Sequence, residues 1–130
     1  MIDCETKVFT RLYNVVAPKC AEGKFINDTV PDAAALPAGI AYEMDSGTVK
    51  SRQSSTPVEN FARITWTLEF YAGKKATLKK IVNVADKEML SMNFSRISGG
   101  YVPNLDNDKV KRWVGRYEVI VDKNGNLYRT

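Results

Sequence analysis

The chain has 130 residues, of which 44% are hydrophobic, and it carries 19 basic and 15 acidic side chains for a net charge of +4. This length suits one compact domain with a single core, so we predict one domain over residues 1–130. The chain has no histidine and only two cysteines, which excludes Ser-His-Asp and Cys-His catalysis and the common zinc sites.

The sequence predicts a soluble protein. No apolar run reaches the roughly 20 residues that span a bilayer. The first residues, MIDCETKVF, carry acids where a secretory signal has a basic region, so we expect the chain to stay in the cytoplasm where it is made. Cys4 and Cys20 lie about 24 Å apart along the first expected helix, which predicts two reduced thiols and no bridge.

Charge is distributed unevenly along the chain. Residues 1–72 hold seven basic and nine acidic side chains, whereas residues 73–130 hold twelve basic and six acidic ones. This gives an acidic front part and a basic rear part. Such polarity is typical of proteins that bind nucleic acid and of proteins whose copies associate head to tail.

Residues 4–17 are predicted to form the first helix, with Asp3 as its N-cap and Pro18 ending it. One helical stripe collects aliphatic side chains, namely Val8, Leu12, Val15 and Val16. The following residues, 21–39, predict a loop with a short strand at Lys24–Asn27.

Two alternating segments predict a long hairpin. Residues 39–45 place Ile40, Tyr42 and Met44 on one face of a strand. Residues 60–72 are the clearest strand, with an apolar face of Ile64, Trp66, Leu68 and Phe70 and a polar face of Arg63, Thr65, Thr67 and Glu69. The polar residues 46–58 form its tip, where Lys50 and Arg52 suit an arm that reaches a partner.

The rear half predicts a second helix and further strands. Residues 74–92 form the helix, with an apolar stripe of Leu78, Ile81, Val82, Ala85 and Met89. Residues 93–98 predict a short strand, 99–108 a loop and 110–122 a long strand, which folds back through Asn124-Gly125. The expected fold is α+β, a mostly antiparallel sheet with two helices packed on one face and a long β-hairpin arm.

The strand at 110–122 separates its aromatic residues from its cations. Trp113 and Tyr117 share one face with Val119 and Val121, whereas the other face carries Val110, Arg112, Val114, Arg116, Glu118 and Ile120. A single-stranded nucleic-acid platform needs aromatics and cations on one surface. Arginines mixed with aliphatic residues suit a protein interface, and an ordinary solvated sheet face is the alternative.

Three other segments carry residue types that occur in binding or catalytic sites. Lys74 and Lys75 begin the second helix without a GxxxxGK[ST] pattern, so they predict a solvated pair or a contact with an acidic patch on a neighbouring subunit. A calcium loop starting at Asn104 fails because Lys109 and Gly115 occupy positions that need Gly and Glu. Glu43 and Asp45 have no nucleophile or base beside them in the sequence. We therefore expect no enzyme, no catalytic residue, no metal and no cofactor.

Three segments together resemble a known family. They are YEMD, then ENFARITWTLEFYAGKKATLKKIVNVADKEMLSMNFSR, then PNLDNDKVKRWVGRYEVIVDKNGNLYR. Their order and pattern resemble the small tail-completion, or tail-terminator, proteins of tailed bacteriophages, which also occur in prophages and in phage-tail-like bacteriocins. The resemblance covers about Ala38 to Arg129.

The resemblance implies a structural role. Proteins of that family are α+β domains that form a hexameric ring on the head-proximal end of the tail tube. The ring stops tube polymerisation and offers the surface that meets the head-side connector, or closes the particle in headless bacteriocins. The implied partners are further copies of the chain, the tail tube protein and the sheath or connector, with no membrane and at most non-specific DNA contact. The implied location is a virion or phage-tail-like particle assembled in the host cytoplasm.

The candidate interface residues, toward another subunit or the tube, are Lys50, Arg52, Arg63, Glu69, Lys74, Lys75, Arg112, Arg116 and Glu118. Two alternative functions stay open at this point. One is a head-tail connector or stopper of the same kind of particle, and the other is a small basic nucleic-acid-binding domain.

Overall fold

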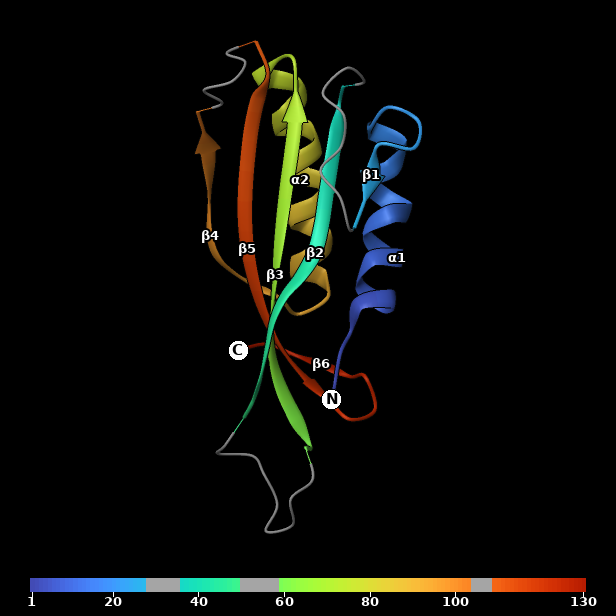
Figure 1. The fold of residues 1–130 in the computed structure, drawn as a ribbon, viewed down its shortest axis with the longest axis vertical. Coiled ribbons are helices and arrows are strands. Elements are labelled where there is room, and N and C mark those ends of the chain that lie inside the picture. The colour runs from blue at the N-terminus through green and yellow to red at the C-terminus, as the bar shows by residue number, and fades with distance from the viewer. Residues whose placement is uncertain (28–35, 50–58, 104–108) are drawn as a thin grey trace.

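The computed structural model of the chain describes residues 1–27, 36–49, 59–103 and 109–130. Its elements in chain order are α1 (Glu5–Val16), a 3₁₀ turn (Ala17–Lys19), β1 (Phe25–Ile26), β2 (Ala38–Thr48), β3 (Phe61–Ala72), α2 (Lys75–Ser91), β4 (Ser95–Val102), β5 (Lys111–Asp122) and β6 (Leu127–Tyr128). Figure 1 shows β2, β3 and β5 as long strands running side by side, with α2 behind them. The α+β fold predicted from the sequence is confirmed.

The sheet has the strand order β1-β2-β3-β5-β4, and β6 pairs with the far end of β5. Every pair is antiparallel except the short pairing of β1 with β2. The predicted hairpin of β2 and β3 is present, and so is the fold-back at Asn124-Gly125, where Gly125 has a φ of 85°. Such a positive φ favours glycine, which explains the residue at this turn.

The core lies between the sheet and the two helices. Ile64, Trp66, Leu68 and Phe70 of β3 are fully buried, and Tyr117 of β5 lies with them. The stripe of α2 predicted as apolar is the stripe that is buried: Leu78, Ile81, Val82, Ala85 and Met89. In α1 the buried residues are Val8, Leu12 and Val16, while Val15 is only partly buried. The helical periodicity therefore identified the packed faces of both helices.

The helix boundaries differ slightly from the prediction. Cys4, and not Asp3, is the N-cap of α1, and its side chain makes no capping bond. Asp3 Oδ1 instead accepts a long 3.4 Å hydrogen bond from the Glu5 N–H. The cap prediction was wrong because Cys4 is itself packed into the core, which starts the helix one residue later. Lys74 is the N-cap of α2, so Lys75 is its first residue.

Two strands are longer than predicted. β2 continues to Thr48, and residues 50–58 of the predicted tip lie outside the described residues. β4 continues through Gly99 and Gly100, which were predicted to begin a loop. That prediction was wrong because Gly99 pairs with Gly115 beneath the Trp113 ring, where a Cβ on Gly99 would lie 2.8 Å from a ring carbon. The glycine serves close packing here and not a turn.

Both cysteines are free thiols, as predicted. Burial raises the pKa of the Cys4 thiol to about 12 and that of Cys20 to about 11, so neither is a thiolate at neutral pH. Within the described ranges, no helix has the length and apolar character needed to cross a bilayer.

Candidate functional site

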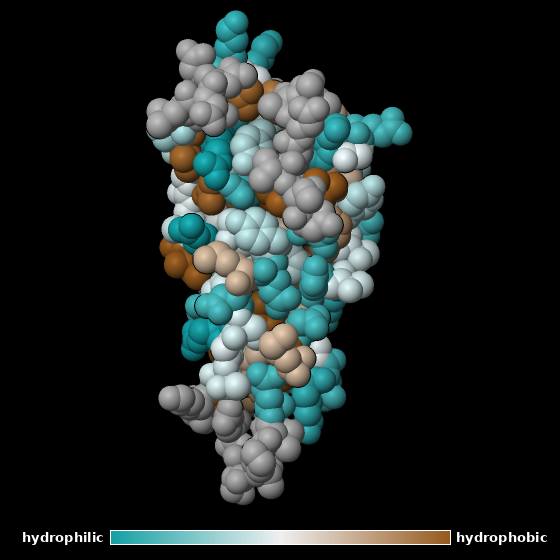
Figure 2. All heavy atoms as spheres, viewed as in Figure 1, coloured by the Kyte–Doolittle hydropathy of each residue, from teal (hydrophilic) through white to brown (hydrophobic). Residues whose placement is uncertain are grey.

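One face of the sheet has no helix on it in the part of the chain that the structure describes. We call it the open face, and it comprises Ile40, Tyr42, Met44 and Asp45 of β2, Arg63, Thr65, Thr67, Glu69 and Tyr71 of β3, Arg112, Val114, Arg116, Glu118 and Ile120 of β5, and Ser98, Gly100 and Val102 of β4. It faces the viewer in Figure 1, and Figure 2 shows hydrophilic and more apolar residues mixed across its middle. The open face holds five of the nine candidate interface residues.

Arg63 and Glu118 form an ion pair across β3 and β5, with Arg63 Nη1 and Glu118 Oε1 2.6 Å apart. Glu118 lies opposite Thr65, so the two charged residues are diagonal neighbours on the same face. The Arg63 side chain is half exposed, and an exposed pair of this kind stabilises a fold by about 0–1 kcal/mol. The pair thus orders the face without adding much stability.

Glu69 and Arg112 form the second cross-strand pair, and it is less exposed. Arg112 Nη2 donates to Glu69 Oε1, while the Tyr42 hydroxyl lies 3.5 Å from Glu69 Oε2. The Arg112 guanidinium also lies 5.9 Å from the centre of the Tyr71 ring. The hydrogen bond to Glu69 raises the pKa of Arg112, so the guanidinium keeps its positive charge at neutral pH.

Arg116 differs from the other charged residues of the open face. It is exposed, and within residues 1–27, 36–49, 59–103 and 109–130 it forms no ion pair. A shallow hollow lies beside it between β4 and β5, lined among others by Gly100, Val102, Arg112 and Val114. Gly100 adds no side chain to this hollow, which Val102 and Val114 line together with the two arginines. Such a hollow suits an apolar side chain accompanied by a carboxylate.

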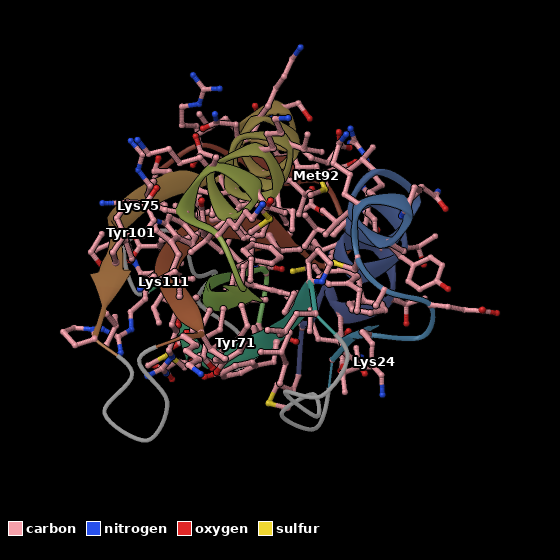
Figure 3. The ribbon with its side chains drawn as sticks, turned by 90° about the horizontal axis from the view of Figure 1, so that it is seen from above. Lys24, Tyr71, Lys75, Met92, Tyr101 and Lys111 are labelled. Atoms are coloured by element: carbon pink, nitrogen blue, oxygen red, sulfur yellow. The ribbon has the colours of Figure 1, made fainter. Side chains whose placement is uncertain are left out.

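Lys74 and Lys75 lie away from the open face, at the start of α2. Lys75 Nζ lies 4.5 Å from the centre of the Tyr101 ring, which belongs to the helix-covered side of β4. Figure 3 shows the side chains of Lys75 and Tyr101 together on the β4 side of the molecule. Lys50 and Arg52 lie outside the described residues.

An acidic region lies at the other edge of the sheet. Asp3, Glu5, Glu43 and Asp45 line a hollow where the N-terminal segment meets β2. Burial and the negative charges of Asp3 and Glu5 raise the pKa of Glu43 to about 7. Among the described residues, no group of three or more His, Cys, Asp or Glu side chains is arranged to hold a metal ion. Sequence reasoning noticed Glu43 and Asp45 but could not place them beside the N-terminus, because that contact joins residues 40 positions apart.

A further network was not predicted. The Tyr117 hydroxyl donates to Asp86 Oδ1 at 2.7 Å, and Arg96 Nη1 donates to the same oxygen at 2.8 Å. Through Asp86 of α2, these hydrogen bonds connect the start of β4, at Arg96, to α2 and to Tyr117 of β5.

No protein-family model matches the chain, and no curated protein matches its sequence.

Proposed function

We propose that the chain is the subunit of a ring, hexameric as the resemblance implies, that caps the head-proximal end of a phage or phage-like tail tube. In this role it stops tube polymerisation and offers the joining surface for the head-side connector. The observation that carries the proposal is the open face, on which paired charges, an exposed arginine and a hollow lined by both valine and arginine side chains lie together. Surfaces of this composition are typical of protein interfaces.

The distribution of charge supports a ring. A closed ring needs heterologous contacts, in which one surface of each subunit meets a different surface of the next. The acidic hollow lies at the β2 edge of the sheet, whereas Lys74, Lys75 and Arg116 lie toward the β4 edge. Opposite charges at opposite edges favour head-to-tail association and disfavour pairing of like edges.

The test is electron microscopy of particles made in a host whose copy of this gene has been deleted. Tails of uncontrolled and often excessive length are the expected result, because tube growth would have lost its stop. Tails of normal length that remain separate from filled heads would assign the chain to the connector instead. Normal particles would overturn the proposal, and steep salt-dependent binding of DNA would then point to the nucleic-acid alternative.

A further inference from the structure

In the part of the chain that the structure describes, the sheet ends on both sides in strands with stretches that no other strand pairs with. No described strand pairs with the outer edge of β4, and β1 pairs with β2 only at Gly39 and Ile40. Among the described residues, no strand pairs with the outer side of the second half of β2, Tyr42–Thr48, and the N-terminal segment lies beside it across the acidic hollow. Each of these edges presents backbone N–H and C=O groups to which a further strand can add.

The edge of β4 lacks most of the features that normally prevent strand addition. Its sequence, SRISGGYV, contains no Lys or Pro, and its one charged residue, Arg96, is held by Asp86. A register shift lies between Arg96 and Ser98, but the pairing is regular from Ser98 to Val102. Ile97 is 56% exposed and Tyr101 is 43% exposed, so apolar surface flanks the regular stretch. A bare edge of this kind needs a partner to be covered.

The strand directions fit the two edges to each other. β2 is antiparallel to β3, β3 to β5, and β5 to β4, so β4 runs antiparallel to β2. In a ring whose axis lies close to the strand direction, the rotation that relates one copy to the next leaves the strand directions unchanged. The β2 strand of one copy therefore runs antiparallel to the β4 strand of its neighbour.

The side chains on the open face also match. Met44 and Asp45 of β2 are both exposed, Met44 by 54%, and among the described residues Asp45 forms no ion pair. A strand added outside β4 places its open-face side chains next to Gly100, above the hollow that Arg116 borders. Met44 then suits the side chains of Val102 and Val114 in the hollow, and Asp45 suits Arg116.

We infer that the outer edge of β4 in one copy of the chain pairs antiparallel with Tyr42–Thr48 of β2 in the next copy, with Asp45 of one copy facing Arg116 of the other. This inference deepens the proposed function, on which it rests, by naming the two surfaces that close the ring. It gives the glycines of β4 a second role, since Gly100 leaves room for the neighbour's side chains.

Charge reversal tests the contact. Arg116→Glu and Asp45→Arg should each weaken self-association about tenfold or more, and the double variant, with the charges exchanged, should restore it. Association is measured by light scattering of the purified chain over a range of concentrations, alone and with tail tubes. Lys79→Glu, on the exposed side of α2, is the matched control, and thermal unfolding followed by circular dichroism verifies that each variant is folded.

Hydrogen exchange tests the strand pairing itself. Outward-pointing amides of Ser98–Val102 should exchange about tenfold or more slowly in the assembled protein than in the monomer. An assembled wild type without this protection, or a folded Arg116→Glu variant that assembles normally, overturns the edge pairing and leaves the capping role intact. A wild type that stays monomeric under every condition, with and without tubes, overturns both.

Discussion

The indole ring of Trp113 lies over the backbone of Gly115, two residues further along β5. A Cβ built on Gly115 would overlap the ring, and the ring is itself held by stacking on Phe70 at a centroid distance of 6.3 Å. Trp113 is 6% exposed, so it has little room to move. Gly115 is therefore required by side-chain packing, even though its backbone conformation is that of an ordinary strand.

We expect Gly115→Ala to destabilise the fold by about 1–3 kcal/mol, as overpacking of a dense core does. Gly100→Ala is the matched control, because a Cβ at Gly100 has open space around it. That variant should change the free energy of unfolding by less than about 0.5 kcal/mol. Urea unfolding of both variants measures the difference, and equal effects would contradict the packing argument.

Arg63 and Glu118 allow a charge-exchange experiment. Arg63→Glu replaces an ion pair with two neighbouring carboxylates and should cost about 1 kcal/mol. The exchanged variant, Arg63→Glu with Glu118→Arg, should recover most of that loss at low salt. A recovery that is absent at low salt would show that the pair contributes nothing to the fold.

Arg112 and Arg116 are expected to respond differently to truncation, although they lie on the same strand face. Arg112→Ala leaves the buried Glu69 carboxylate without its partner and should cost about 2 kcal/mol. Arg116→Ala removes an exposed side chain and should change stability by less than about 0.5 kcal/mol. Thermal unfolding of the two variants compares them directly, and similar losses would contradict the buried pairing of Glu69.

The periodic elements of this fold could be predicted from the sequence because each depends on local spacing. The stripe of α2 and the apolar face of β3 were identified in full, since burial of one face fixes the period of apolar residues. Thr67 and Glu69, on the predicted polar face of β3, are buried as well. Turn signals were less dependable. A Gly-Gly pair occurs both in loops and in strands. At Gly99 the strand is favoured by the Trp113 ring on the neighbouring strand, a contact that the local sequence does not reveal.

The candidate site could be predicted only as a set of residues. Periodicity placed Arg112, Arg116 and Glu118 on one face, and the structure agrees. Which carboxylate pairs with which arginine depends on the register of β3 against β5. These two strands are far apart in the sequence, because α2 and β4 lie between them. The difference between the paired Arg112 and the exposed Arg116 therefore has no signal in the local sequence.

Glu43 makes the stability of the protein depend on pH. Burial, followed by the charges of Asp3 and Glu5, raises its pKa to about 7 from the ordinary value of 4.5. The folded chain thus keeps a proton that the unfolded chain releases, so stability falls as the pH rises from about 4.5 to about 7. A shift of this size corresponds to at most ~3 kcal/mol, and partial exposure of the side chain reduces the expected effect to about 1 kcal/mol.

Glu43→Gln removes the ionisation and keeps the shape of the side chain. Its stability should be close to that of the wild type at pH 4, where Glu43 is protonated, and greater by about 1 kcal/mol at pH 8. Urea unfolding at both pH values measures this. Glu22→Gln, which removes an exposed carboxylate, controls for the loss of one negative charge. If Glu43→Gln gained the same stability at pH 4 as at pH 8, the gain would have to come from packing, and the protonation of Glu43 would have no part in it.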